Sequence, residues 1–281
     1  NITDWFLWLN DKKFGFIRES LEHLDYEIKK LNWEWIKVFY DTPENIIPYL
    51  ALKYSITNII ANKSYSRYWT KRDENIKNIL NQNNISFSLE KDYLLVEPDE
   101  IEQRKVFTPF YKLWQKQLWD TTEKNPTNFK QLKIEENFDV SDFIKIKKHP
   151  YFTIEFWENR LKNYIRENYD EYRNDLDKDW TSKLSPYLRF WIFSVRQIYN
   201  IAKNKNESFV SELAWREFWQ HINYYFPETK NTEFQENKRH IKWSSDEYLF
   251  EKWCRWETWY PIVDACMKQL VETNWMHGRG R

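Results

Sequence analysis

The chain has 281 residues, of which 41% are apolar and 31% are charged, and its formal net charge is zero. This is an ordinary composition for a globular protein, and the length is enough for two domains. No apolar run reaches the roughly 18 residues that a membrane span needs, so a membrane protein is disfavoured. The basic excess that is usual in nucleic-acid binders is missing, so any DNA contact must come from specific residues.

The two cysteines are Cys254 and Cys266. They match neither a disulfide framework nor a zinc spacing, so we expect free thiols, a reducing cytoplasmic location and no metal site.

The first part of the chain alternates helix and strand signals. Apolar residues recur at helical spacing in 14–31, 42–55 and 71–84, and short strand-like runs occupy 36–41, 57–63 and 85–96. Thr42 is expected to cap the second of these helices, with Pro43 in its first position. Strands that alternate with helices predict an α/β domain over residues 1–119, with a parallel sheet covered on both faces.

The second part of the chain is predicted to be helical. Residues 107–119 form the last helix of the first domain, and the polar stretch 120–150 resembles an inter-domain linker. Residues 151–281 then show helical periodicity without comparable strand signals, and predict an all-α domain. Its helices are expected at 153–168, 185–205, 207–226, 245–256 and 260–274.

The predicted helical domain contains seven motifs in a fixed order. They are Tyr169 with Arg173, then TSKLSPYLRF, SVRQIY, SELAWREF, IKW, YPIVDACMKQL and WMHGRGR. With ANKSYSRY, KRDENI and KVFTPF in the first domain, the chain resembles the DNA photolyase/cryptochrome family of flavoproteins, and within it the class I photolyases for cyclobutane pyrimidine dimers. The resemblance implies a Rossmann-like antenna domain without its first strand and a truncated FAD-binding helical domain, so we expect a fragment.

The resemblance also implies which residues hold FAD. Hydroxyls and backbone N–H groups at a helix start are natural phosphate ligands, which fits the segment before Pro186. Without the resemblance, an ordinary helix cap is the favoured interpretation of a serine before that proline, and Lys183 could be merely a solvated charge. The residues expected to contact FAD are Tyr169, Thr181, Ser182, Lys183, Leu184, Ser185, Phe209, Glu212 and Arg281.

Glu212 and Trp215 are the expected catalytic residues. They are three positions apart, so they share one side of a helix. In the family that the chain resembles, the matching Glu hydrogen-bonds the damaged bases and the matching Trp stacks on the flipped-out dimer, as an extruded base requires. An amphipathic helix with a core Trp remains the alternative. The other expected DNA contacts are Arg216, Trp275, Met276 and Arg279.

The implied activity is light-dependent repair of cyclobutane pyrimidine dimers in UV-damaged DNA, by electron transfer from reduced FAD. Trp243 matches the outermost member of the electron-transfer chain of tryptophans, and Glu102 with Lys105 mark where an antenna chromophore of the methenyltetrahydrofolate or deazaflavin type could bind. Gly278 stands where the family usually has Asn, so a cryptochrome-type photoreceptor without repair activity is the alternative. A non-catalytic helical interaction domain would not need these motifs together. We expect a monomer.

Glycine is unusually scarce. The chain has 3 Gly and 17 Trp, whereas average usage would give about 20 Gly. The family that the chain resembles usually has Gly at the positions of Trp180, Trp191, Trp256 and Trp259. We therefore hypothesise that the gene uses a code in which UGA specifies glycine and that these codons were written as tryptophan. The same reasoning makes suspects of Trp33, Trp35, Trp69 and Trp157.

Overall fold

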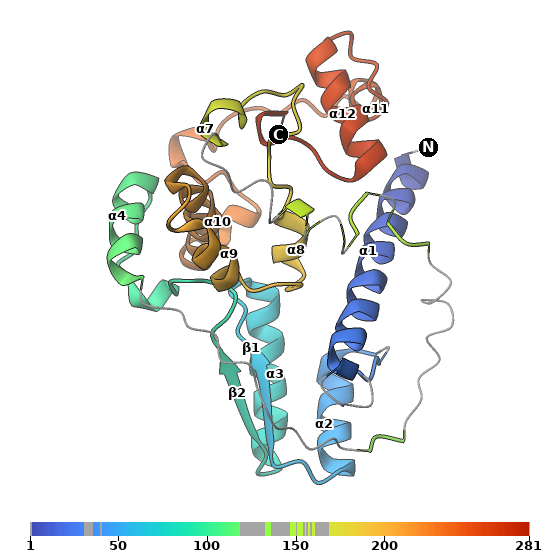
Figure 1. The fold of residues 1–281 in the computed structure, drawn as a ribbon, viewed down its shortest axis with the longest axis vertical. Helices are drawn as coiled ribbons and strands as arrows, with labels where there is room; N and C mark the ends of the chain where they lie inside the picture. The colour runs from blue at the N-terminus through green and yellow to red at the C-terminus, as the bar shows by residue number, and fades with distance from the viewer. Residues whose placement is uncertain are drawn as a thin grey trace. The chain divides into compact units, whose positions relative to one another are not determined.

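The computed structural model describes residues 2–30, 36–39, 41–118, 133–135, 147–149, 151–153, 155, 157, 159–160 and 169–280, with side chains in the first helix from residue 12 onward. The chain divides into two compact units, each assembled from separate stretches of sequence (Figure 1). Unit 1 contains Asn1–Ile36, Asp139–Ile192 and Ile241–Arg281, and unit 2 contains Lys37–Phe138 and Phe193–His240. The sequence-based boundaries at 119 and 151 stay a prediction, and most of the predicted linker 120–150 lies outside the described residues.

Unit 2 contains a parallel βαβ element, which confirms the predicted α/β class. Strand β1 (Asn58–Asn62) is followed by helix α3 (Arg67–Gln82) and strand β2 (Ser86–Glu90). The strands pair in parallel, with Asn58 opposite Ser86 and Asn62 opposite Glu90. Helix α2 (Pro43–Lys53) precedes β1, and its Ala51 joins Ile76, Leu80, Ile85 and Phe87 in a buried apolar cluster. Burial of these side chains fixes the helices against the sheet.

One predicted strand is absent from its described residues and another is shorter than predicted. Residues 36–39 form neither helix nor strand, and the strand signal in 85–96 ends with β2. Beyond β2, the backbone N–H groups of Leu95 and Val96 donate to the Glu217 carboxylate rather than to a neighbouring strand. Thr42 does precede α2, with Pro43 in the first turn, but its side chain makes no capping bond.

The remaining helices of unit 2 are α4 (Phe107–Gln117), α9 (Val195–Ala202) and α10 (Glu207–Tyr225), with short 3-10 turns at Pro98–Glu100, Pro227–Lys230 and Glu236–Lys238. Helix α9 begins with a capping box formed by Ser194 and Gln197, and Asn206 caps α10 through the Phe209 N–H at 2.8 Å. The single helix predicted over 185–205 is therefore wrong, because the chain leaves one helix and caps another between 190 and 194.

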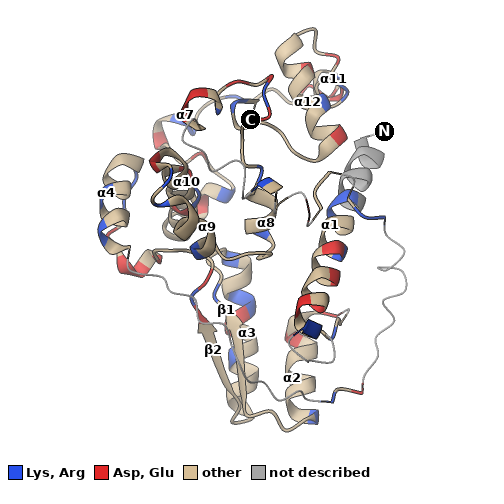
Figure 2. Ribbon diagram, viewed as in Figure 1, with Lys and Arg blue, Asp and Glu red and all other residues tan. Residues whose placement is uncertain are grey.

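Unit 1 is built around the long helix α1 (Ile2–Lys30), which begins earlier than the predicted 14–31. Residues of opposite charge lie along its described part (Figure 2), where Arg18 pairs with Glu22 at 2.8 Å and Lys29 with Asp25 at 2.6 Å. Phe16 of this helix is buried, and its ring lies edge-on to that of Tyr187, with 5.2 Å between centroids.

The shorter helices of unit 1 are α7 (Tyr169–Tyr172), α8 (Ser185–Arg189), α11 (Glu247–Cys254) and α12 (Pro261–Thr273), followed by a 3-10 turn at Gly278–Gly280. The Lys12 ammonium of α1 donates to the carbonyls of Val271 (3.2 Å) and Glu272 (2.6 Å), which have no partner within the last turn of a helix. Across the described part of both units, no helix combines the length and the apolar character needed to span a bilayer.

Candidate functional site

The segment Thr181–Ser185 of unit 1 forms the irregular approach to α8. Ser182 Oγ accepts the Leu184 N–H at 3.4 Å, while its own O–H proton remains for another acceptor. Thr181 Oγ1 is buried and has no hydrogen-bond partner, a costly state for a hydroxyl unless a ligand completes it. Lys183, between them and the helix, has a positive φ of 53°. The helix itself has only five residues, so it contributes less to anion binding than the sequence predicted.

Charged side chains hold this segment in place through hydrogen bonds and ion pairs. The Arg160 guanidinium donates to the Thr181 carbonyl at 3.1 Å and pairs with the Asp179 carboxylate, which also pairs with Lys183 at 2.8 Å. Burial opposes ionisation of Asp179, but the hydrogen bonds from Arg160 and Lys183 outweigh it and lower the pKa of the carboxyl below its usual value. Asp179 is therefore ionised at neutral pH and holds both cations in place.

A cavity of about 240 Å³ opens beside these residues, within unit 1. Its lining includes Tyr151, Arg160, Asp179, Lys183, Thr273 and Trp275. The Lys183 ammonium lies 4.8 Å from the centre of the Trp275 ring, within range of a cation–π contact. The cavity therefore combines an aromatic wall with fixed positive charge, which suits a partly aromatic, anionic ligand.

Three consecutive residues after α12 are buried, namely Trp275, Met276 and His277. Trp275 is 7% exposed, and Met276 packs with Cys266 and Met267 in an apolar cluster. Arg279 donates through Nε to the Asn174 side chain at 2.9 Å, and its N–H donates to His277 Nδ1 at 3.1 Å. The DNA contacts predicted for Trp275, Met276 and Arg279 stay a prediction. Trp275 and Met276 would have to become more exposed before DNA could contact them.

The other predicted site residues of unit 1 lie apart from the cavity lining. Tyr169 is buried at the start of α7, and Trp243 is 73% exposed. Arg281 lies outside the described residues, as do Trp33 and Trp35.

Helix α10 of unit 2 carries Phe209, Glu212, Trp215 and Arg216. Phe209 is buried and Glu212 is exposed. The half-buried Trp215 stacks on Phe107 of α4, with 3.6 Å between ring centroids and 7° between planes. Phe107 thus covers one face of the indole and helps to fix its plane, and the Trp219 ring is a second near-parallel neighbour, with 6.3 Å between centroids and 26° between planes.

Arg216 faces the segment that follows β2. Its guanidinium donates to the Tyr93 carbonyl at 2.9 Å and lies 4.2 Å from the centre of the Tyr93 ring. The contact with the DNA backbone predicted for Arg216 would have to compete with these internal contacts.

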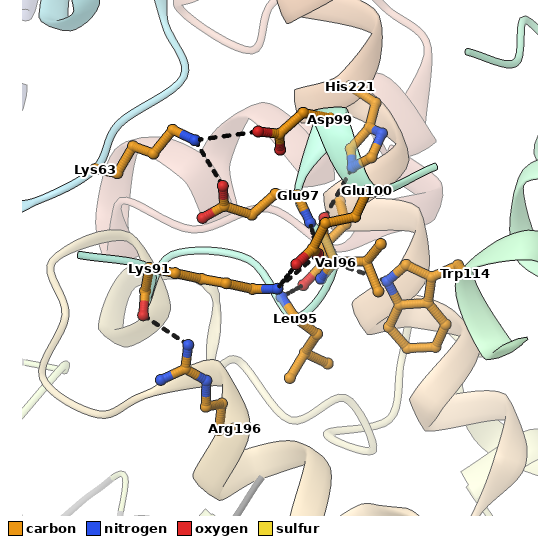
Figure 3. A network of polar contacts seen from close by, with 11 residues as sticks. Lys63, Lys91, Leu95, Val96, Glu97, Asp99, Glu100, Trp114, Arg196 and His221 are labelled. Carbon is orange, nitrogen blue, oxygen red and sulfur yellow. Dashed lines mark hydrogen bonds and ion pairs between the residues drawn. The ribbon is translucent and has the colours of Figure 1, made fainter. Parts of the chain in front are cut away.

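The structure also contains an unpredicted carboxylate, Glu217, whose donors Leu95, Val96 and Trp114 belong to the polar network drawn in Figure 3. Glu217 is fully buried and accepts the Leu95 N–H (2.6 Å), the Val96 N–H (3.1 Å) and the Trp114 indole N–H (2.6 Å). Burial raises the pKa of Glu217, while these three donors oppose the shift.

Further hydrogen bonds attach residues 91–100, which follow β2, to helices α9 and α10. His221 Nε2 lies 2.9 Å from the Val96 carbonyl, and Arg196 donates to the Lys91 carbonyl at 2.6 Å. Glu100 accepts from the Lys91 ammonium at 2.6 Å and from the Glu97 N–H at 2.7 Å. The network therefore positions α10, and with it the side chains of Glu212 and Trp215.

Sequence reasoning missed Glu217 although a signal was present. The buried positions of α10 include Leu213, Ala214, Glu217, Phe218 and His221, and the carboxylate falls on this apolar face. Arg160 and Asp179 were also missed, because their pairing bridges 19 residues and leaves no periodic signal.

Two family models match the chain. Residues 3–128 match the model described as DNA photolyase, and residues 209–281 match the FAD binding domain of DNA photolyase. The chain belongs to the DNA photolyase/cryptochrome family. FAD is accordingly the cofactor of the helical part, as predicted.

Individual photolyases and cryptochromes agree with this assignment. The deoxyribodipyrimidine photo-lyase of Synechococcus sp. is 31% identical over 84% of this chain and 56% of its own length. Cryptochrome-2 of Arabidopsis thaliana is 26% identical over 98% of this chain and 53% of its own. The crystal structure of an archaeal photolyase from Sulfolobus tokodaii with two FAD molecules is 27% identical, with a TM-score of 0.84 over 96% of this chain and 62% of that one. The chain thus spans little more than half the length of its relatives.

The residues of unit 1 fit the phosphate part of FAD. The buried Thr181 hydroxyl lacks a partner and the Ser182 O–H is available, and both can donate to phosphate oxygens. Lys183 adds a positive charge, although Asp179 already neutralises part of it. The predicted site residues on α10, namely Phe209, Glu212, Trp215 and Arg216, belong to unit 2, whereas the segment Thr181–Ser185 belongs to unit 1.

Proposed function

We propose that the complete protein is a deoxyribodipyrimidine photo-lyase, a carbon–carbon lyase that repairs cyclobutane pyrimidine dimers in UV-damaged DNA under light. The observation that carries the proposal is the pair Glu212 and Trp215 on one side of α10, next to each other and away from the buried face. The family assignment and the hydroxyl segment Thr181–Ser185 support it.

Reduced FAD supplies the electron for dimer splitting when it is bound and has absorbed blue light, directly or through an antenna chromophore. The chain supplies positioning. Thr181 and Ser182 hold the pyrophosphate, and Trp215 offers the ring face opposite Phe107 to an extruded base. Glu212 accepts hydrogen bonds from the base edge through its carboxyl oxygens.

Replacement of Trp215 tests this role. In the complete protein, Trp215→Ala should weaken binding of dimer-containing DNA by about 1–3 kcal/mol, because one base loses its stacking partner. Flavin absorbance should be unchanged and light-dependent dimer reversal should fall. The control is Trp253→Ala on α11, another partly exposed tryptophan (40%), where reversal should persist. Equal losses in both variants would contradict the assignment.

Cryptochrome-type photoreception is the second candidate, favoured by Gly278 and by the similarity to Cryptochrome-2 of Arabidopsis thaliana. The decisive measurement is light-dependent reversal of dimers by the complete protein loaded with FAD. Bound flavin without reversal would select the photoreceptor, and reversal would select the lyase. We further propose a monomer in the cytoplasm, where the free Cys254 and Cys266 stay reduced.

A further inference from the structure

Left-handed backbone conformations occur at unexpected residues in this chain. Among the described residues, positive φ angles are found at seven that are not glycine, and three of these are Trp191 (51°), Trp256 (52°) and Trp259 (67°). None of the glycines has a positive φ. A bulky residue in this region is an outlier, because its Cβ approaches the carbonyl oxygen, whereas glycine adopts it without cost.

Trp191 and Trp256 stand at equivalent places, one residue past the cap of a helix. After α8, the Ile192 N–H donates back to the Tyr187 carbonyl at 3.0 Å. After α11, the Glu257 N–H donates to the Lys252 carbonyl at 2.9 Å. These six-to-one bonds define the Schellman motif, in which the residue that turns left-handed is usually glycine.

Two other helices of the chain end in the same way and show what the position accepts. After α2 the left-handed residue is Ser55, where Ile56 N–H bonds the Ala51 carbonyl at 2.8 Å. After α3 it is Asn84, where Ile85 N–H bonds the Leu80 carbonyl at 3.0 Å. Serine is small, and asparagine tolerates this conformation through local hydrogen bonds. Tryptophan has neither property.

Trp259 lies in the tight loop between α11 and α12. Its N–H donates to Asp264 Oδ2 at 3.2 Å, and the Thr258 N–H donates to Asp264 Oδ1 at 2.9 Å. These bonds fix the backbone of the loop, while the indole itself is 88% exposed. The loop thus uses the conformation of residue 259 and not its side chain.

The exposure of the three indoles points the same way. Trp191 is 41% and Trp256 38% exposed, in contrast with Trp114 at 0%. Packing of these two side chains in a core therefore does not explain why their backbones are left-handed. We propose that the native protein carries glycine, not tryptophan, at positions 191, 256 and 259, because the codons there specify glycine in the cell that makes it.

The backbone angles also reduce the number of tryptophans for which glycine is proposed. Trp180 has no positive φ, and its ring lies 4.6 Å from that of Tyr172. Trp69 lies inside α3, where its ring contacts the Arg72 guanidinium at 4.5 Å. The backbone gives no reason for glycine at these two positions, so the inference is limited to the three left-handed ones.

Peptide mass spectrometry of the protein isolated from its source cells tests the inference without any variant. Peptides that contain positions 191, 256 and 259 should be lighter by the difference between a tryptophan and a glycine residue. Peptides that contain Trp114, Trp215 and Trp275 are the internal controls and should keep the tryptophan mass. The gene should show one shared codon at the first three positions and a different codon at the controls. A tryptophan mass at the three positions, or the same codon at all six, would overturn the inference.

Discussion

The Glu217 carboxylate receives three N–H donors in a place without access to water. A buried carboxylate is costly unless its lone pairs are satisfied, and here two backbone amides and one indole satisfy them. These contacts involve only a few atoms. They nevertheless fix Leu95 and Val96, which belong to the segment that connects β2 to α4.

The variant Glu217→Gln should reduce the free energy of unfolding by about 2 kcal/mol, because the amide NH2 turns a donor toward a position that needs an acceptor. Urea denaturation checks this value. Glu212→Gln, an exposed position on the same helix, should change stability by less than about 0.5 kcal/mol. If both variants lose the same amount, the three contacts do not carry this stability.

His149 in unit 1 gives stability a dependence on pH. Its Nδ1 accepts the N–H groups of Tyr151 (3.1 Å) and Phe152 (3.0 Å), so this nitrogen must be unprotonated. Burial, helped by the positive charge of Lys12, lowers the pKa of His149 to about 4. The unfolded chain binds a proton here below about pH 6.5, whereas the folded chain does not, so the free energy of unfolding should fall as pH decreases from 6.5 toward 4.

The matched variant is His149→Asn, whose side-chain oxygen can still accept both N–H groups but does not titrate. Between pH 7 and pH 4 the original protein should lose about 2–3 kcal/mol more than the variant. Denaturation at a series of pH values measures both curves. Parallel curves would show that His149 contributes nothing to the pH dependence.

At this scale the sequence was informative where a residue type has a local meaning. Asn206 and Ser194 are residue types that favour helix caps and do cap helices, although the helix predicted over 185–205 ran through Ser194. It was uninformative for Glu217 and Asp179, because their partners lie far along the chain or on the backbone, and no spacing rule encodes such contacts.

Among the elements, α1 depends on a glycine in its middle. A Cβ at Gly15 would lie 2.1 Å from the Lys147 carbonyl oxygen, so the helix can approach residues 147–149 only without a side chain there. In an isolated helix alanine would be favoured over glycine by about 1 kcal/mol. The close approach reverses this preference.

Gly15→Ala should therefore lower the free energy of unfolding by about 1–3 kcal/mol, since overpacking outweighs the gain in helix propensity. The midpoint of chemical denaturation measures the change. Gly278→Ala serves as the control, because a Cβ at Gly278 has no atom within 4 Å and should be tolerated. A rise in stability for Gly15→Ala would mean that the segment 147–149 moves aside easily.

The end of α11 offers a second test at this scale. Trp256→Gly should raise the free energy of unfolding by about 1 kcal/mol, because it relieves a side chain in the left-handed region. Trp253→Gly, three residues earlier and inside the helix, should lower it by about 0.5 kcal/mol through lost helix propensity. Thermal denaturation of the two variants should therefore give opposite shifts, and shifts of the same sign would refute the strain at residue 256.

Helix ends also explain the main error in the predicted elements. Apolar periodicity continues from 185 to 205 and predicts one helix, but the Schellman motif after α8 and the capping box of α9 interrupt it. Written as tryptophan, residue 191 hides the stop signal that a glycine would have given.

For the molecule as a whole, the fold class and family could be predicted, because alternating periodicities and ordered motifs are distributed along the sequence. The division into units could not. Unit 2 combines Lys37–Phe138 with Phe193–His240, and this pairing depends on contacts such as Leu95 with Glu217, 122 residues apart. Nothing in a local window indicates a partner so distant.

The interleaved order of the units bears on how the protein is made. Every residue of unit 2 has been synthesised once the ribosome passes His240, whereas unit 1 needs both its first segment and Ile241–Arg281. Lys12 of helix α1 can make its contacts to Val271 and Glu272 only once the ribosome has passed Glu272, 260 residues later. During vectorial synthesis Phe16 must likewise wait for its ring partners Phe152, Tyr187 and Phe190, so it offers an apolar target to a nascent-chain chaperone until they are made.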